Sequence, residues 1–595
     1  MLAPDTLNRV MARLDQWPER RRFWLIFLGT AVLIFLGLGL HSPWPPDSPR
    51  FVEVAREMVD SGQWMLPMRG GELYPDKPPV FMWTLAALYW LTGNLKLTYL
   101  IPNALCGLLT VFLVYDLGRR LWNPRVAALA AVLLLLPVQF VTQTKNAQID
   151  GMEMAWVTVG CYGLLRHFLL GPAWGWYLAG FAFMGLGVIT KGVGFLPIFL
   201  LLPVLWWRWR DNTLPTGTLG WRLWLGPVAM LAVIACWLVP MLLYVQHLNT
   251  PDALAYRDNI LFKQTGHRYA NAWMHIEPWY FFIAKVIPGQ WFPLPFLLLA
   301  LWRPLVRLWR SDPALRILLV WVVLVVAFFS LSPGKRGLYV LPALPMFTLA
   351  VAAVLDRALS DGQRPSRWFG AVITGAQAIL AVALVVTGGL ALADFPALVK
   401  GAKRFTDDPS LWHQAGAMLL VAGLIWCALL WGFRRSDALA RWFVGMMAAW
   451  VLYATWGFTI LEPVKTPRNV LARAEALTPP DAQLGLLNFS EQLILFSRKD
   501  MTHFSYFSSV EQQERNAWQW MAEGPDRYLV IETGTDLSCF DDTTAAPLGK
   551  ADRTRFLLLG PAQRKAACPA PEPRERFVVP TPCAHSGLCE PGSTP

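Results

Sequence analysis

Long runs of apolar residues occupy most of the chain between residues 23 and 461, and they limit what it can fold into. A helix that crosses a membrane needs roughly 20 mostly apolar residues, and about thirteen segments come near that requirement. They lie near 23–40, 98–118, 126–142, 151–170, 174–190, 193–207, 223–246, 279–302, 317–332, 338–355, 368–393, 411–433 and 442–461. We therefore expect a polytopic α-helical membrane protein.

The composition leaves little polar surface for a chain of this length. Of the 595 residues, 55% are hydrophobic and 15% are charged. A soluble globular chain carries roughly 25% charged residues. This difference excludes a cytosolic enzyme and a disordered scaffold. The formal net charge of +12 does not indicate a basic patch for nucleic acid, so the expected surroundings are membrane lipids.

The arginines gather in alternate short loops, whereas every lysine lies on the opposite side or in the part of a span nearest to it. The arginine-bearing segments are Arg20–Arg22, Arg119–Arg125, Arg166, Arg208–Arg222, Arg303–Arg316, Arg357–Arg367 and Arg434–Arg441. Cytoplasmic loops of membrane proteins carry an excess of arginine and lysine. This pattern predicts a cytoplasmic N-terminus, and an odd number of spans then places the C-terminus outside.

Three longer polar segments, 41–97, 247–278 and 463–595, fall on the outer side. The last of them loses the membrane pattern, and its short strand-like runs around a helix near 510–521 predict a small α/β domain. We therefore divide the chain into a membrane domain, 1–462, whose first outer loop is 41–97, and an outer domain, 463–595. An oxidising compartment would allow disulfides there, although the sequence leaves their pairing open. The cysteines concerned are Cys539, Cys568, Cys583 and Cys589.

The first outer loop contains two charged motifs. Ser48 and Pro49 are typical of an N-cap and a first helical residue, which would leave Asp47 outside the helix and free to project into a cavity. In the alternative, Asp47 itself caps the helix. Further along, Asp76 and Lys77 precede two prolines and an apolar stretch, 78–93. Lys77 could bind a phosphate there, or the two residues could form a surface ion pair.

More charged residues lie where other spans reach the outer side. Asp150 stands at the mouth of the fourth span and Lys191 interrupts an apolar sequence. Ionisable residues at membrane depth indicate a site, although a helix cap and a snorkelling lysine are the alternatives. His275 in loop 247–278 could bind a divalent ion or could simply be solvated. Lys335 and Tyr339 belong to a basic turn entering the tenth span.

No Walker motif, GxSxG elbow, HExxH or CxxC pair occurs in the sequence, so nucleotide-driven transport and the familiar hydrolase chemistries lack support. The distribution of the charged residues is more informative. Acidic, basic and histidine residues from several separate loops all map to one face of the membrane. Accidental positions would scatter to both faces, so we expect the functional site at the outer face.

These motifs resemble the first-loop and loop signatures of the GT-C glycosyltransferases, membrane enzymes that take a sugar from a polyprenyl-phosphate carrier. The resemblance is greatest to the bacterial branch with the lipid A 4-amino-4-deoxy-L-arabinose transferases, and protein O-mannosyltransferases are more distant. It extends to about residue 345. The segments that carry it are 47–58, 76–83, 148–152, 189–192, 275–280 and 334–342. Ser48 and Asp76 stand where relatives commonly have glutamate.

The resemblance implies roles for individual residues. Asp47 and Asp150 match the catalytic acidic positions. The donor-phosphate positions are Arg50, Lys77, Lys191, Lys335 and Tyr339. Asp76 and His275 match positions that can hold a divalent ion (Zn²⁺, Mg²⁺ or Mn²⁺), and no other cofactor is implied.

The implied protein is a monomeric, multi-pass enzyme of the bacterial inner membrane with a periplasmic C-terminal domain. It would transfer a monosaccharide, aminoarabinose or a hexose, from a polyprenyl phosphate to lipid A or another lipid or glycan acceptor, with inversion. Three alternatives remain: a lipid-linked-sugar flippase, a protein O-mannosyltransferase, and an oligosaccharide ligase or polymerase.

Overall fold

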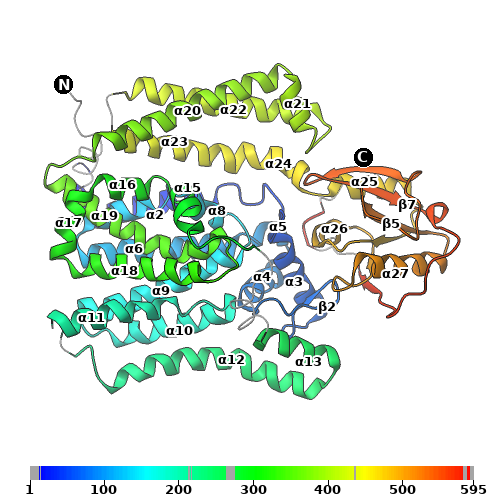
Figure 1. Cartoon of the computed structure of the whole chain (residues 1–595), viewed down its shortest axis with the longest axis horizontal. Helices are drawn as coiled ribbons and strands as arrows, with labels where there is room; N and C mark the ends of the chain where they lie inside the picture. The colour runs from blue at the N-terminus through cyan, green and yellow to red at the C-terminus, as the bar shows by residue number, and fades with distance from the viewer. Residues whose placement is uncertain are drawn as a thin grey trace.

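The computed structural model describes residues 13, 15–211, 215, 217–262, 275–434, 437–580 and 586–589. The chain forms a large helical bundle and a smaller domain built on a sheet, and the first long loop lies between the two (Figure 1). The outer domain is therefore separated from most of the bundle by residues of the first loop.

Helices account for nearly all of the membrane domain. Its longer helices are α2 (Glu19–Phe35), α6 (Ile101–Leu121), α7 (Pro124–Leu133), α8 (Val138–Thr144), α9 (Ile149–Leu170), α10 (Trp174–Lys191), α11 (Leu201–Asp211), α12 (Leu225–Leu248), α13 (Pro251–Asp258), α16 (Leu294–Ala300), α17 (Trp302–Ser311), α18 (Pro313–Leu331), α19 (Leu344–Ser360), α20 (Arg367–Leu392), α21 (Pro396–Ala402), α22 (Pro409–Gly432), α23 (Ala438–Leu452) and α24 (Phe458–Lys465). Short helices η1 (Leu196–Leu200), η2 (Trp221–Trp224), η4 (Phe282–Val286), α15 (Ile287–Gln290), η5 (Gly337–Ala343) and η6 (Tyr453–Gly457) connect or extend them.

Each predicted span coincides with helix in the described part of the chain. Seven helices there are long and apolar enough to cross a membrane, or up to nine if each of two bent pairs counts as one span. The pairs are α7 with α8, bent by 76°, and the helices on either side of Pro293, bent by 98°. The multi-pass architecture is thus confirmed, while thirteen separate spans are not. Proline interrupts both pairs, since Pro137 and Pro293 remove backbone donors where the axis turns.

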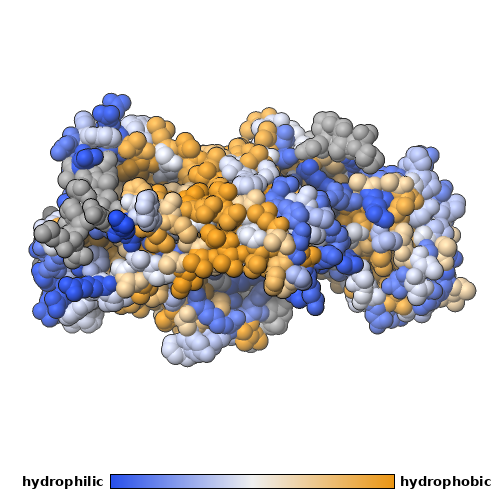
Figure 2. Space-filling model, turned by 90° about the horizontal axis from the view of Figure 1, so that it is seen from above, coloured by the Kyte–Doolittle hydropathy of each residue, from blue (hydrophilic) through white to orange (hydrophobic). Residues whose placement is uncertain are grey.

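The surface of the bundle is suited to lipid. Figure 2 shows an apolar band across the middle of the molecule, with hydrophilic residues gathered at both ends. Exposed apolar side chains of the bundle include Leu28 on α2, Leu231 on α12 and Val382 on α20. In water these side chains would be an aggregation hazard, whereas in a bilayer they are solvated by acyl chains.

Glycines let neighbouring helices approach closely inside the bundle. On α9 and α10, Gly160, Gly163 and Gly180 face one another, and a Cβ on Gly163 would collide with the backbone of Trp176. Small residues allow close backbone packing where lipid supplies no hydrophobic drive between helices. This contact fixes the relative position of the two helices that carry Asp150 and Lys191.

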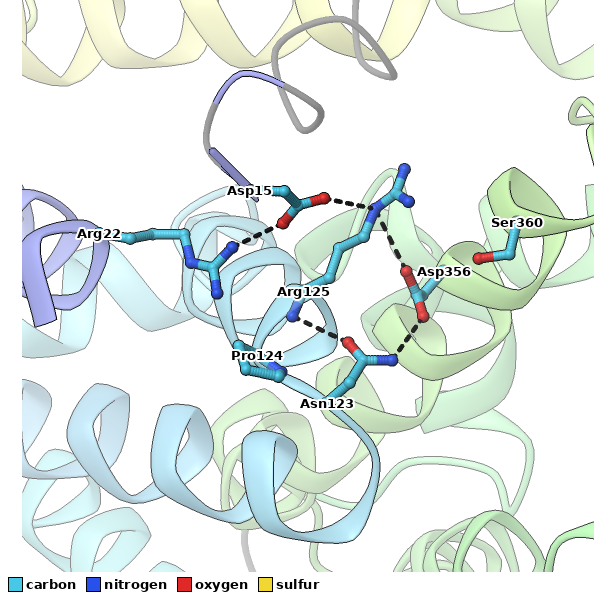
Figure 3. A pocket seen from close by; sticks show the side chains of 7 residues that line it. All are labelled: Asp15, Arg22, Asn123, Pro124, Arg125, Asp356 and Ser360. Atoms are coloured by element: carbon cyan, nitrogen blue, oxygen red, sulfur yellow. Dashed lines mark hydrogen bonds and ion pairs between the residues drawn. The ribbon is translucent and has the colours of Figure 1, made fainter. Parts of the chain in front are cut away.

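The bundle end remote from the sheet domain carries a polar cluster (Figure 3). Asp15, Arg22, Asn123, Arg125 and Asp356 line a cavity of about 350 Å³ there. The Arg22 guanidinium donates to Asp15 at 2.6 Å, and the Asn123 side chain donates to Asp356 at 2.9 Å. The arginines at this end therefore tie the start of the chain to α7 and α19.

The first long loop is largely structured. Its elements are α3 (Ser48–Ser61), a hairpin of β1 (Met68–Arg69) and β2 (Glu72–Leu73), α4 (Val80–Thr92) and α5 (Leu95–Thr98). The predicted apolar helix at 78–93 is α4. Eight consecutive residues of α3, from Phe51 to Met58, are buried, and they include the ion pair of Arg56 with Glu53 at 2.8 Å. This loop is thus a packed layer at the end of the bundle.

The outer domain is built on a mixed six-stranded sheet. The strand order is β6-β7-β5-β3-β4-β8, in which β4, β3 and β5 are parallel and the other pairs are antiparallel. The strands are β3 (Gln483–Leu486), β4 (Met501–His503), β5 (Arg527–Glu532), β6 (Ala546–Ala551), β7 (Thr554–Leu559) and β8 (Phe577–Val579), and the helices are α25 (Arg468–Leu477), α26 (Glu491–Phe496), α27 (Val510–Ala522) and the short η7 (Pro561–Gln563). The expected mixture of strands and helices is therefore present. Cys539 and Cys568 form a disulfide, and Cys583 lies outside the described residues.

Candidate active site

Asp47 lies where the bundle meets the first loop. It occupies the position before α3, so Ser48 is the first helical residue and not the cap that its pattern suggests. The Asp47 carboxylate does not cap the helix either, because it makes no hydrogen bond to the backbone of the first turn. It instead accepts a hydrogen bond from the Gln148 side chain at 3.1 Å. Asp47 therefore lies just outside the helix with its carboxylate turned to Gln148, although Ser48 is not the cap on which that expectation rested.

Two arginines flank this carboxylate. Nη1 of Arg336 lies 3.7 Å from Asp47 Oδ2, and Nη1 of Arg50 lies 3.8 Å from Oδ1. Both distances exceed an ordinary hydrogen bond, while the Asp47 side chain is only 13% exposed. The guanidinium groups therefore place positive charge beside Asp47 without being locked to it.

Asp150, Lys191 and Tyr339 come together close by. Asp150 is the second residue of α9, and Lys191 is the last residue of α10, where Gly192 ends the helix in a left-handed conformation. Lys191 forms an ion pair with Asp150, and both side chains are 12% exposed. Its ammonium nitrogen lies 5.0 Å from the centre of the Tyr339 ring. Gln148, which donates to Asp47, immediately precedes α9, so Asp47 and Asp150 belong to one continuous site.

Lys335 and Arg336 face different partners. The Lys335 ammonium donates to the backbone carbonyl of Glu277 at 2.7 Å. The backbone N–H of Lys335 donates to the carbonyl of His275 at 2.9 Å. The side chain that faces Asp47 is that of Arg336. Of these two neighbours, the sequence prediction selected Lys335 and omitted Arg336, although both belong to the basic turn.

Asp76 and Lys77 lie half-buried just before α4. Arg50 extends from α3 toward the outer domain, where its Nε donates to Glu491 at 3.3 Å. Glu491 is a site residue that sequence reasoning missed. It lies 441 residues away from Arg50 along the chain, so no local pattern could indicate the contact.

The predicted metal ligands do not form a recognisable metal centre. His275 is exposed, with a positive φ of 58°, and follows residues 263–274, which contain His267 and lie outside the described residues. Across the described ranges, no group of three or more His, Cys, Asp or Glu side chains could hold a metal ion. Structural and catalytic zinc sites use three or four protein ligands. Asp76 and His275 alone do not meet that requirement, and we derive no step through a metal.

The outer domain contacts the first loop through buried polar groups. Glu57 accepts hydrogen bonds from the N–H groups of Gly70 and Gly71, which fixes the hairpin turn to α3. His503 contacts the Gly70 carbonyl, while Glu72 accepts from the Ser505 hydroxyl at 2.6 Å. Burial lowers the pKa of His503 to about 4. The hairpin is thus held by α3 on one side and by the outer domain on the other.

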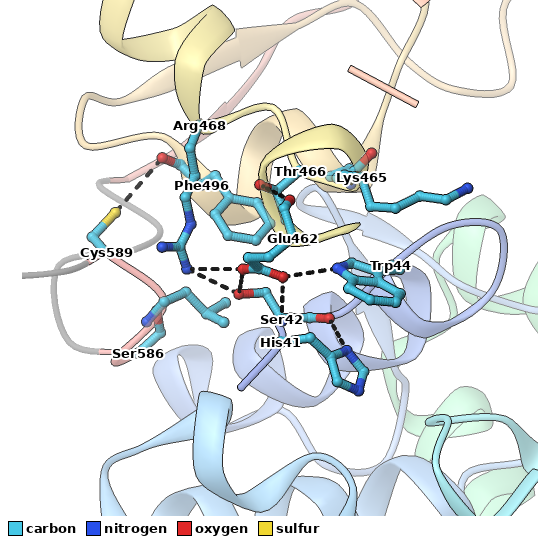
Figure 4. Close-up of polar contacts among 12 residues, drawn as sticks. His41, Ser42, Trp44, Glu462, Lys465, Thr466, Arg468, Phe496, Ser586 and Cys589 are labelled. Atoms are coloured by element: carbon cyan, nitrogen blue, oxygen red, sulfur yellow. Dashed lines mark hydrogen bonds and ion pairs between the residues drawn. The ribbon is translucent and has the colours of Figure 1, made fainter. Parts of the chain in front are cut away.

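A second junction joins the last helix of the bundle to the beginning of the first loop (Figure 4). The Glu462 carboxylate accepts hydrogen bonds from the Ser42 N–H at 2.9 Å, the Ser42 hydroxyl at 2.6 Å and the Trp44 indole at 2.8 Å. Arg468, at the beginning of the outer domain, lies 3.4 Å from the same carboxylate. The first loop, the last helix and the outer domain therefore meet at one half-buried carboxylate.

The sequence is similar to one protein family and to several known transferases. The sequence model of the dolichyl-phosphate-mannose-protein mannosyltransferase family matches residues 22–253. An undecaprenyl phosphate-alpha-4-amino-4-deoxy-L-arabinose arabinosyl transferase of Pseudomonas savastanoi pv. phaseolicola is 28% identical over 473 residues, which cover 77% of this chain and 82% of that protein. A similarly named transferase 1 of Pseudomonas fluorescens is 30% identical over 356 residues, covering 58% of this chain and 57% of its own length.

A solved structure shares the fold over nearly the whole chain. The crystal structure of ArnT from Cupriavidus metallidurans bound to undecaprenyl phosphate superposes with a TM-score of 0.68 at 20% identity, covering 90% of this chain and 98% of that one. Its apo state gives a TM-score of 0.67, covering 92% and 99%. The expected GT-C architecture is confirmed by this match. The chain therefore has the multi-pass GT-C fold, and it is similar to the undecaprenyl phosphate-aminoarabinose arabinosyl transferases.

Proposed function

We propose that the protein transfers 4-amino-4-deoxy-L-arabinose from undecaprenyl phosphate to lipid A or a similar acceptor of the cell envelope. The single observation that carries the proposal is the arrangement around Asp47, a carboxylate set between two loosely held arginines. The names of the most similar relatives supply the sugar and the carrier. A hexose donor remains the main alternative for the sugar.

The proposed chemistry is one displacement at the anomeric carbon of the donor sugar. The bond from this carbon to the phosphate oxygen breaks, and its electron pair stays on the leaving undecaprenyl phosphate. A new bond forms from an acceptor oxygen on the opposite face, so the configuration inverts. Asp47 accepts the proton of an acceptor hydroxyl, or orients an acceptor phosphate that has no proton to lose.

Several cations are in reach of the leaving phosphate in this proposal. Arg50 and Arg336 flank Asp47, while Lys191 is held by Asp150 and lies over the Tyr339 ring. Lys77 before α4 completes the group. Preorganised positive charge stabilises the charge that develops on the phosphate oxygen in the transition state. Asp150 acts through Lys191, because the ion pair fixes where the ammonium points.

We further propose the topology that the arginine pattern predicts. The polar cluster of Figure 3 then faces the cytoplasm, and the outer domain, residues 463–595, lies in the periplasm of a bacterial inner membrane as part of a monomer. In this orientation the site opens toward the periplasmic leaflet. Cysteine labelling of intact and of permeabilised spheroplasts tests the orientation. Labelling of the outer domain only after membrane permeabilisation would contradict it.

A transfer assay with the purified protein in nanodiscs tests the activity. The donor is undecaprenyl phosphate-aminoarabinose, and lipid A is the acceptor. Asp47→Asn and Lys77→Ala should each lower turnover by about 10²-fold or more, in line with the loss of a general base or a charge stabiliser. Asp361→Asn, at the remote end of the bundle, is the matched control and should keep full activity.

The same assay distinguishes the alternatives. Near-normal turnover in both Asp47→Asn and Lys77→Ala would refute the proposed site. Movement of the intact donor across the bilayer without cleavage would instead identify a flippase. Turnover with a polyprenyl-phosphate mannose and a hydroxyl-bearing peptide would support the protein O-mannosyltransferase alternative, which the family model favours.

A further inference from the structure

Glu491 brings a negative charge from the outer domain into the proposed donor site. It is the first residue of α26, and its side chain is 15% exposed. Its Oε1 lies 3.3 Å from Nε of Arg50 and 3.1 Å from Nε of Arg69. One carboxylate is therefore shared between an arginine of α3 and an arginine of β1.

The two arginines are held to different degrees. The Arg69 guanidinium lies 4.1 Å from the centre of the Tyr506 ring and 4.8 Å from that of Phe489, and its side chain is 13% exposed. The Arg50 side chain is 31% exposed and faces Asp47 at 3.8 Å. Arg69 is thus fixed to the outer domain by aromatic rings, whereas Arg50 is the partner that an incoming phosphate can draw away from Glu491.

The charge on the phosphate changes during the proposed reaction. In the donor, the phosphate is a diester with one negative charge. After the sugar has left, it is a monoester, which carries a charge of roughly −1.5 to −2 at pH 7. A fixed carboxylate beside Arg50 repels both species, and the repulsion scales with their charge. It therefore disfavours the product more strongly than the donor.

We propose that Glu491 is a residue of the outer domain that promotes release of the undecaprenyl phosphate product by competing with it for Arg50. This inference rests on the proposed function. It gives the outer domain a part in turnover, because the carboxylate reaches the site only while that domain is docked on the first loop. Arg69 keeps the Glu491 carboxylate in place when Arg50 turns to the phosphate.

Glu491→Gln removes the charge and keeps the shape of the side chain. We expect this variant to bind undecaprenyl phosphate about 3- to 10-fold more tightly than the parent protein, since Arg69 and salt screen part of the repulsion. Binding of the methyl diester of undecaprenyl phosphate should tighten less, by about 2- to 4-fold, because its single charge gives a smaller repulsion energy. Multiple-turnover rates should fall as product inhibition grows, while the first turnover stays at the parent rate.

Two further variants sharpen the test. Arg69→Met leaves Glu491 to Arg50 alone, so binding of undecaprenyl phosphate should weaken, opposite in sign to Glu491→Gln. Glu511→Gln changes an exposed carboxylate of α27 and should alter neither affinity. Thermal unfolding of each variant checks that the outer domain remains folded.

The outcomes separate the two proposals. Unchanged or weaker binding of undecaprenyl phosphate by Glu491→Gln, or equal tightening of monoester and diester, overturns the release role while the proposed function stands. Failure of the parent protein to bind undecaprenyl phosphate, or to transfer sugar from it, overturns both. Greater tightening of the monoester than of the diester, together with slower multiple turnover, supports the inference.

Discussion

Removal of the Glu462 carboxylate should loosen the contact between the outer domain and the first loop. The carboxylate accepts three hydrogen bonds from Ser42 and Trp44 and lies near Arg468. Hydrogen bonds to a charged group contribute about 1.5–3 kcal/mol each. The side chain is 14% exposed, so water can reach part of the freed groups.

Because water reaches part of the freed groups, we take a value just below the smallest sum for three such bonds, about 4 kcal/mol for Glu462→Ala. Each 1.36 kcal/mol corresponds to a factor of ten, so local opening at Ser42 should become roughly 10³-fold more frequent. Glu462→Gln should have an intermediate effect of about 1.5 kcal/mol, or roughly tenfold. The amide still accepts from Ser42 and Trp44, and the Ser42 hydroxyl can turn to accept from its NH₂ group, while Arg468 loses its counter-ion.

Hydrogen–deuterium exchange of the protein in nanodiscs, followed in peptides that cover residues 37–46 and 463–478, measures this opening. Glu511→Gln, on the exposed face of α27, serves as the control and should exchange like the parent protein. The reasoning would be refuted if Glu462→Ala accelerated exchange by less than tenfold, or if the alanine and glutamine variants were indistinguishable.

Three further predictions concern stability. Burial lowers the pKa of His503 from 6.5 to about 4, so between these pH values the folded state binds fewer protons than the unfolded state. Stability should therefore fall as the pH drops from about 6.5 to 4. His503→Gln should flatten this dependence in thermal unfolding. A Cβ on Gly194 would collide with the backbone of α10 at Met184 and Gly187, whereas one on Gly175 would meet nothing within 4 Å. Gly194→Ala should therefore lower the melting temperature, and Gly175→Ala should leave it unchanged or raise it. Asp150→Asn and Lys191→Met should each destabilise the protein by about 3 kcal/mol, and the double variant should be more stable than either; additive losses in differential scanning fluorimetry would contradict this pairing.

The membrane part of the fold could be predicted because a bilayer imposes a simple rule on the sequence. Apolar runs become helices there, and every predicted span coincides with one. The two bends depend on how prolines are accommodated by neighbouring helices, and apolar length alone does not specify them. For the outer domain, β3, β5 and β7 coincide with apolar runs of the sequence, whereas the edge strand β8 (Phe577–Val579) is apolar but only three residues long, too short a run to predict a strand.

The site was predictable where a local pattern marks the end of a helix. Asp47, Asp150 and Lys191 each stand at such an end, and the structure brings the latter two into contact. Gln148 and Arg336 lie within recognised motifs. Which side chain of a motif faces the site, however, depends on the backbone direction of the loop that enters the helix. Glu491 lacks even that signal, since it reaches Arg50 only through the docking of a separate domain.

The hairpin of β1 and β2 has a consequence for how proteins of this architecture can be recombined. It is bound by Glu57 of α3 and also by His503 and Ser505 of the outer domain, so it belongs structurally to both. A chimaera that exchanges residues 463–595 alone would pair a foreign surface with a resident hairpin. The smallest transferable unit therefore joins loop 41–97 to the outer domain, although more than 350 residues separate them in the chain.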